Sequence, residues 1–211
     1  MSPIQFFLRH DREILQATLE HVWLVGRTMI FAIAIGVPLG ILVTRKPWLS
    51  KPILGGANIA ETIPSLALFG FLLPVPWLGG RADRLAIAAL TLYALLPIIR
   101  NTSAGITGVD RAVREAARGM GMTDRQILFQ VELPLSFSTM LAGIRIATVL
   151  TIGIATIAAA VGAGGLGEFI FRGLAMVNNQ LILAGAIPAA LLALAADFVL
   201  GVLERRLRPV R

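Results

Sequence analysis

Long apolar stretches that carry almost no charge limit the fold of this sequence more than any other feature. Only 15% of its 211 residues are charged, whereas a typical soluble domain has about 25%. A helix of about 20 apolar residues crosses the hydrocarbon core of a bilayer. Five stretches approach or exceed that length, and they cover residues 21–44, 52–73, 85–99, 135–162 and 181–203. The sequence therefore predicts an all-α, polytopic membrane protein with five transmembrane helices.

Residues 1–20 differ from these stretches because charged and apolar side chains are mixed within them. Phe6 and Ile14, for example, flank Arg9. This mixture is typical of an amphipathic helix that lies in the membrane interface. We expect an N-terminal interfacial segment over residues 1–20 and a transmembrane domain over residues 21–211.

Basic residues are distributed unequally between the two sides of the predicted spans. Twelve lie on the side that holds the loop 101–134 and the C-terminus, and five lie on the other side. Cytoplasmic segments of membrane proteins carry an excess of lysine and arginine. We therefore expect the C-terminus and the loop 101–134 in the cytoplasm and the N-terminus outside. The twelve are Arg45, Lys46, Lys51, Arg100, Arg111, Arg114, Arg118, Arg125, Arg205, Arg206, Arg208 and Arg211.

The composition also limits the chemistry of the chain. There is no cysteine, and the two histidines are His10 and His21. Thiolate metal sites are therefore excluded, and the two histidines offer little basis for histidine-based catalysis. Neither lysine, Lys46 or Lys51, follows a glycine, so the chain lacks the phosphate-binding loop of an ATPase. We expect no enzymatic activity and no bound metal or cofactor in this chain.

The loop 101–134 is the most informative part of the sequence. Asp110 suits the N-cap of a helix over residues 111–118, and glycines follow where that helix must end. Residues 123–126 begin with threonine and end with glutamine, which is the spacing of a capping box. We expect the second helix to end at Leu133-Pro134, since proline disrupts a helix interior. The prediction is two short helices joined by a glycine elbow at the membrane surface.

The same loop contains a pattern with fixed spacing. Glu-Ala-Ala is followed after three residues by glycine, and after nine more by an aliphatic residue, one arbitrary residue, leucine and proline. This pattern resembles the EAA loop of ABC-importer permeases, with valine in place of isoleucine. The alternative is a solvated charged loop without such a role. The matching residues are Glu115, Ala116, Ala117, Gly121, Val131, Leu133 and Pro134.

This resemblance implies an architecture and a set of partners. In that family the first short helix of the loop is a coupling helix, which seats in a groove of a cytoplasmic ATPase subunit. The implied assembly in the prokaryotic inner membrane contains two permease subunits, identical or paralogous, each with a five-helix core of the type I importers. Two ATPase subunits bind ATP and Mg²⁺, and an extracytoplasmic binding protein delivers the solute.

Residues 61–68, 93–102 and 162–167 also resemble one branch of this family. That branch imports osmoprotectants such as glycine betaine, choline and carnitine, so a small osmoprotectant is the expected solute. It often has glutamine where this chain has Glu61. Two alternatives stay open: a permease for another small solute, such as an amino acid or a different betaine, and a secondary carrier. Transport without any ATPase subunit would favour the carrier.

Ionisable residues inside a predicted span are costly and are candidates for function. Glu61 lies three residues before Pro64, whose ring removes a helical hydrogen bond, and Ser65 follows directly. These three residues are the candidate translocation path, where a carboxylate would favour a cationic solute. The alternative for Glu61 is a buried carboxylate that pairs with Arg27 or another polar neighbour.

Two other features have structural interpretations. Asp197 lies near the cytoplasmic end of the last span, and we expect it to snorkel or to pair with Arg145. Residues 162–167 match the glycine spacing of a dinucleotide-binding loop, but no strand precedes them. We expect a turn at the outer end of the fourth span instead.

Overall fold

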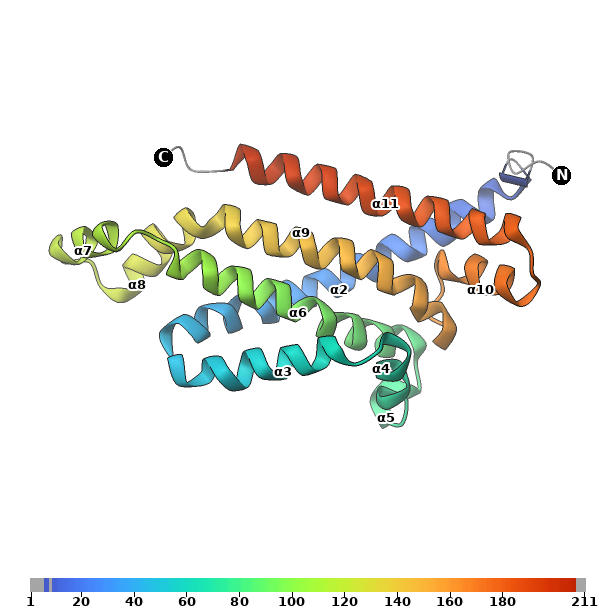
Figure 1. Ribbon diagram of the computed structural model, residues 1–211, viewed down its shortest axis with the longest axis horizontal. Coiled ribbons are helices and arrows are strands. Elements are labelled where there is room, and N and C mark those ends of the chain that lie inside the picture. The colour runs from blue at the N-terminus through green and yellow to red at the C-terminus, as the bar shows by residue number, and fades with distance from the viewer. Residues whose placement is uncertain (1–5, 8, 208–211) are drawn as a thin grey trace.

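The computed structural model describes residues 6, 7 and 9–207, and every regular element within them is helical. Four long helices run side by side along the long axis of the molecule (Figure 1). They are α2 (Asp11–Arg45), α6 (Ala82–Thr107), α9 (Leu133–Ala158) and α11 (Asn179–Arg206). The shorter elements are η1 (Pro47–Leu49), α3 (Ser50–Thr62), α4 (Ser65–Leu72), α5 (Pro76–Gly79), α7 (Arg111–Gly119), α8 (Asp124–Ile127), η2 (Leu128–Glu132), η3 (Ala159–Val161) and α10 (Gly167–Ala175).

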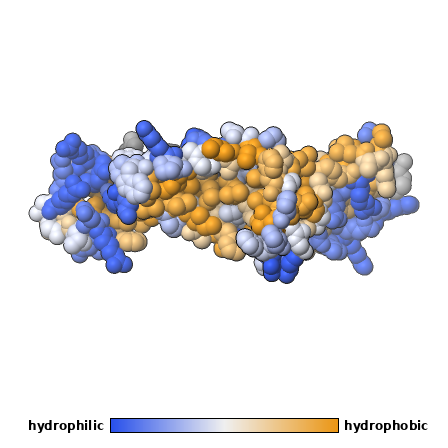
Figure 2. All heavy atoms as spheres, turned by 90° about the horizontal axis from the view of Figure 1, so that it is seen from below, coloured by the Kyte–Doolittle hydropathy of each residue, from blue (hydrophilic) through white to orange (hydrophobic). Residues whose placement is uncertain are grey.

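The two ends of the bundle carry different short elements (Figure 1). The α7 end holds α7 and α8, and helices α2 and α11 both run toward it. The α10 end holds α10 and the first turns of α2 and α11. Figure 2 shows hydrophilic clusters at both ends and a mainly apolar surface between them. This is the distribution of polarity that a bilayer requires of a spanning protein.

The predicted fold class is confirmed, with the second span broken rather than continuous. In the described residues, four helical stretches are long and apolar enough to cross a bilayer, and the bent pair Pro47–Thr62 and Ser65–Leu72 makes a fifth candidate. The two parts of that pair are bent by 107°. Ile63 and Pro64 between them are extended, with ψ of 128° and 137°. Proline disfavours the helical conformation of the residue before it, which explains where the span breaks.

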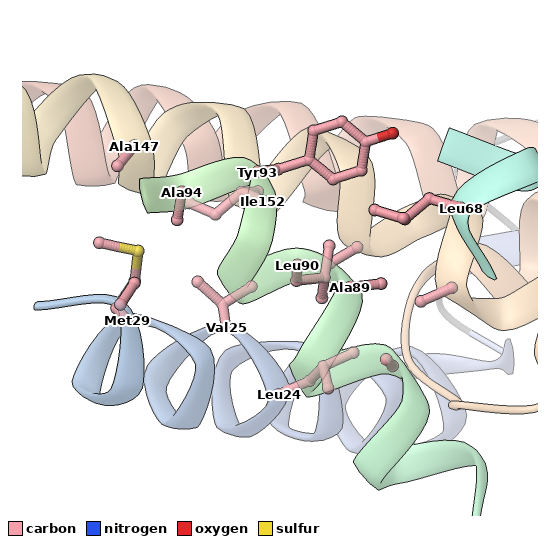
Figure 3. Packing of buried hydrophobic residues seen from close by; sticks show 14 of the residues in the cluster. Leu24, Val25, Met29, Leu68, Ala89, Leu90, Tyr93, Ala94, Ala147 and Ile152 are labelled. Carbon is pink, nitrogen blue, oxygen red and sulfur yellow. The ribbon is translucent and has the colours of Figure 1, made fainter. Parts of the chain in front are cut away.

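Helix α6 forms the centre of the bundle and packs against both α2 and α9. Of the four long helical stretches, the one formed by α6 is the most buried, and α11 is the least buried. Val25 of α2 and Leu90 of α6 lie in the same buried apolar cluster (Figure 3). Farther along, a Cβ at Gly40 of α2 would lie 2.6 Å from the Cβ of Thr102. A small residue is therefore needed there for the two helices to approach closely.

The first long helix begins before the predicted start of the first span. Helix α2 runs without interruption from Asp11 to Arg45, so residues 11–20 are helical and continuous with the predicted span. The reason is a single buried stripe: Ile14, Ala17 and His21 are all buried and follow one another at helical spacing. Residues 1–5 and 8 of the predicted segment lie outside the described residues.

The helix of the third predicted span extends past the predicted end of that span. Helix α6 continues through Arg100 to Thr107, so residues 101–107 of the predicted loop 101–134 are helical. No glycine or proline interrupts residues 100–104, and the exposed guanidinium of Arg100 donates a hydrogen bond to Asn58 of α3 at 2.7 Å. A charged residue at the end of an apolar stretch therefore does not end this helix.

Candidate coupling and translocation site

The predicted helical hairpin after α6 is confirmed, and its caps explain its shape. The Asp110 side chain accepts a hydrogen bond from the N–H of Ala112 at 2.8 Å and caps α7. After α7 the chain turns at Gly121, whose φ is +82°. At α8 both arms of the capping box are present, between Thr123 and Gln126. The hairpin projects at one end of the bundle (Figure 1).

The Glu-Ala-Ala residues of α7 do not all face outward. Glu115 is exposed and accepts a hydrogen bond from Arg111 at 2.7 Å. Ala116 is also exposed, whereas Ala117 is only 2% exposed. The spacing of the sequence motif alone does not distinguish these three residues. In the folded chain, Glu115 and Ala116 are available to a partner, and Ala117 packs the helix against its own subunit.

The prediction that the second helix ends at Leu133-Pro134 is wrong. After α8 the chain forms the π-helical segment η2 and passes directly into α9. The N–H of Leu133 bonds to the carbonyl of Leu128, five residues earlier, and Pro134 occupies the first turn of α9. Pro134 cannot donate the helical hydrogen bond of its position, and the π-helical turn η2 lies directly before it. Val131 and Leu133 are half-buried on this continuous helix.

Sequence reasoning missed Glu132, the arbitrary position of the motif. Its carboxylate is buried, 1% exposed, in η2. It forms an ion pair with Arg45 at the end of α2, and Arg114 of α7 lies 4.0 Å away. The only local signal is a charged residue between two aliphatic ones, and nothing in the sequence identifies the two arginines as its partners.

The candidate path residues lie at the break of the second span, away from the hairpin (Figure 1). Glu61 is in the last turn of α3, and Ser65 begins α4. The break is held by Tyr93 of α6, whose hydroxyl donates to the carbonyl of Ile63. Glu61 is exposed within this single chain. The structure therefore brings Glu61, Pro64 and Ser65 together, in a group separate from residues 115–134.

The buried ion pair suggested for Glu61 is absent from the described residues. Arg27 instead lies over the ring of Trp23, with its guanidinium carbon 5.7 Å from the ring centroid. The pairing expected for Asp197 is confirmed, because Arg145 donates two hydrogen bonds to it, of 2.7 and 2.8 Å. Arg145 also donates to Glu204 at 3.3 Å.

The turn expected over residues 162–167 is also confirmed. Gly162 and Gly164 have φ of +81° and +80°, which glycine adopts without steric cost. The chain then enters α10, a nine-residue helix with three buried residues. Sequence reasoning did not predict α10, since nine residues are too few to give a clear apolar period.

An apolar bundle of this form, with a capped and exposed hairpin at one end, defines a polytopic α-helical membrane protein. Comparison with known proteins makes this class specific. Residues 36–209 match the family described as "Binding-protein-dependent transport system inner membrane component". The chain belongs to this family and is a permease subunit of an ABC transporter in the inner membrane.

Individual relatives cover nearly the whole chain. The carnitine transport permease protein OpuCB of Listeria monocytogenes is 45% identical, over 98% of this chain and 93% of the relative. The osmoprotectant import permease protein OsmW of Salmonella typhimurium is 41% identical, over 99% of this chain and 98% of the relative. Among solved structures, a chain of the inward-facing MetNI methionine ABC transporter is similar, with a TM-score of 0.83 at 25% identity, covering 94% of this chain and 97% of that one.

Proposed function

We propose that this permease forms part of the translocation path for a small osmoprotectant and that α7 docks on a separate cytoplasmic ATPase subunit. The observation that carries the docking role is the capped helix α7, which projects from the apolar bundle with Glu115 and Ala116 exposed. The substrate class rests on similarity to permeases named for carnitine and for osmoprotectants. Glycine betaine, choline and carnitine are the solutes to test first.

The same proposal assigns the partners. Two ATPase subunits supply hydrolysis of Mg²⁺-bound ATP, and a second permease, identical or paralogous, completes the path. The family description supports an extracytoplasmic binding protein that delivers the solute. In this assembly the chain itself performs no chemistry and holds no cofactor.

The charge distribution supports a cytoplasmic location for the α7 end. Helix α7 and the hairpin carry basic residues, and so do the last turns of α2 and α11. Such an excess marks the cytoplasmic side of a membrane protein. Of the residues counted for this orientation, Arg208 and Arg211 lie outside the described residues.

Glu61 is proposed to face the path together with Pro64 and Ser65. Its carboxylate is exposed at the break of a span, and no cation pairs with it among the described residues. Exposure to lipid would be costly, so in the assembled transporter this group faces water or the second permease. A carboxylate in the path would attract the quaternary ammonium group of these solutes.

The test of the function is uptake by proteoliposomes that contain the permease, its ATPase and its binding protein. We expect uptake of radiolabelled carnitine, choline or glycine betaine that requires both ATP and the binding protein. Uptake without the ATPase would contradict the docking role. Uptake restricted to amino acids would contradict the substrate class but leave the docking role intact.

The path assignment is tested with Glu61→Gln. A unit charge about 4 Å from a cation in a water-filled path contributes about 1 kcal/mol, so choline uptake at subsaturating concentration should fall about fivefold. The matched control is Glu13→Gln, which removes an exposed carboxylate from the first turn of α2. Equal uptake by the Glu61 variant and the control would show that the Glu61 carboxylate does not act on the solute in the path.

Docking is tested by cross-linking. Because the sequence has no cysteine, Ala116→Cys provides a single thiol without background. We expect this thiol to cross-link to the ATPase subunit. Glu115→Gln and Gly121→Val should leave the permease inserted in the membrane while reducing both the cross-link and uptake. A thiol at position 116 that reacts only from the extracytoplasmic side would reverse the proposed orientation.

A further inference from the structure

A buried carboxylate lies where the docking hairpin joins the spans. Glu132 is 1% exposed and belongs to η2, the π-helical segment between α8 and α9. The two arginines around it come from different parts of the chain. Arg114 belongs to α7, and Arg45 is the last residue of α2. One side chain therefore connects three elements at the α7 end.

The two carboxylate oxygens of Glu132 face arginines from different helices. The Arg45 guanidinium Nη2 pairs with Oε2, and Nη1 of Arg114 lies 4.0 Å from Oε1. The Arg45 and Arg114 side chains are 36% and 30% exposed, so their charges reach water while the carboxylate does not. Burying a carboxylate is costly unless cations compensate it. An apolar residue at this position would pack without that cost, so packing alone does not account for the charge.

Two further observations connect this carboxylate with motion of the hairpin. Helix α7 has a single buried residue, Ala117, so apolar packing holds it only weakly to the bundle. Arg114 also donates to the carbonyl of Thr107 at 3.5 Å, at the limit of a hydrogen bond. Moreover, π-helical segments are rare and are frequent at functional sites. Among the described residues, the contact of Arg114 with Glu132 is the ion pair that connects α7 to the partner of Arg45 in the first span, since the other arginines of α7 pair within the hairpin.

We propose that Glu132 is a positioning residue that transmits movement of α7 to α2. The inference rests on the proposed docking of α7. When the ATPase displaces α7, Arg114 moves with it, and the carboxylate between the two arginines carries the displacement to Arg45. Helix α2 packs along α6, so the movement reaches the centre of the bundle. The cluster of Arg45, Arg114 and Glu132 is thus the link between docking helix and spans.

The first test measures the number of solutes transported per ATP in reconstituted transporter. Glu132→Gln keeps the size of the side chain but removes its charge. We expect basal ATP hydrolysis and cross-linking from position 116 to persist. The transport-to-hydrolysis ratio should fall at least about fivefold, which is the lower end of typical coupling between two sites. Glu132→Asp keeps the charge and should recover part of the ratio.

A second variant keeps the test decisive if Glu132→Gln fails to insert. Arg114→Gln removes only the α7 arm of the cluster and leaves the Arg45–Glu132 pair intact, so the fold is retained. It should lower the ratio as Glu132→Gln does. The matched control is Asp124→Asn, because Asp124 is an exposed acid of α8 that pairs with another arginine of α7, Arg118, at 3.9 Å. The ratio should be unchanged in this control.

A distance measurement separates transmission from a purely structural role. Spin labels on Val113→Cys in α7 and Lys46→Cys after α2 report how these elements move relative to each other. In the parent protein the distance should stay constant between nucleotide-free and ATP-bound states, since the cluster joins the two elements. In Glu132→Gln it should change with nucleotide, because α7 then moves without α2.

The outcomes distinguish this inference from the docking proposal. If position 116 of the parent protein does not cross-link to the ATPase, the docking proposal fails, and the inference fails with it. If the cross-link forms but Arg114→Gln and Glu132→Gln both keep the parent transport-to-hydrolysis ratio, only the transmission role is overturned. A label distance that stays constant in all variants would also overturn the transmission role.

Discussion

The two ends of the bundle hold their irregular segments by different kinds of contact. At the α7 end, long charged side chains bridge elements that share little apolar packing, with Glu132 at the centre. At the α10 end, the chain turns through glycines and lies directly on a buried ring. A Cβ at Gly165 would lie 3.1 Å from Nδ1 of His21, and His21 Nε2 is 3.0 Å from the carbonyl oxygen of Ile152.

This difference indicates how much each end can move. Close packing tolerates only small displacements, because protein interiors are as dense as organic crystals. The ion pairs at the α7 end join α7, η2 and α2 without such packing, so these elements can shift together relative to the rest of the bundle. The α10 end is therefore suited to stay fixed, and the α7 end is suited to transfer motion.

The largest effect should come from filling the closest contact of the α10 end. A Cβ at Gly167 would lie 1.9 Å from the carbonyl oxygen of Thr156 and 2.7 Å from the Cβ of Ala159. Gly167→Ala should lower the free energy of unfolding in detergent by about 3 kcal/mol, since backbone must shift to relieve the clash. Gly153→Ala is the control, because a Cβ there meets nothing within 4 Å. Equal stability of both variants would show that the α10 end is not tightly packed.

A matched pair of glycines compares the ends directly. Gly165 and Gly121 have nearly the same φ, +81° and +82°, but a Cβ at Gly121 meets nothing within 4 Å. An alanine at either position costs about 1–2 kcal/mol, because its backbone must adopt the left-handed conformation. Gly165→Ala should cost about 1 kcal/mol more, because His21 must also give way. Unfolding of the two variants in detergent gives the difference, and a larger loss for Gly121→Ala would reverse the comparison.

Features set by residues close together in the sequence could be predicted from it. The spans follow from apolar stretches, and the caps at Asp110 and Thr123 follow from side chains that bond within three residues. Both kinds of prediction are confirmed. The predicted helix ends are less accurate. The sequence predicts ends near Arg100 and Pro134, yet Arg100 lies within α6 and Pro134 fits the first turn of α9.

The parts that could not be predicted depend on contacts between distant residues. Arg45 and Glu132 are 87 positions apart, and no local pattern indicates that they meet. The spacing of the loop motif also did not reveal that Ala117 faces its own subunit while Ala116 is exposed. The 107° bend of the second span lies at Pro64, but no local pattern indicates that Tyr93 of α6 donates a hydrogen bond to the carbonyl of Ile63 there. Local patterns thus predicted the long spans and the capped hairpin, but neither the short helix α10 nor the ionic cluster at the α7 end.

The smallest effect should come from an exposed pair on α7 itself. The side chains of Arg111 and Glu115 are 87% and 57% exposed, whereas that of Glu132 is 2% exposed. Exposed pairs four residues apart on a helix contribute about 0.3–0.5 kcal/mol. Arg111→Gln should therefore lower the free energy of unfolding by about that amount at low salt. At about 1 M salt the Debye length is only about 3 Å, so this loss should disappear, while the loss caused by Glu132→Gln should persist because water and ions do not reach its carboxylate. If salt removed both losses equally, the cluster at Glu132 would behave as a surface pair, and the contrast between a mobile ionic link and a solvated charge would be lost.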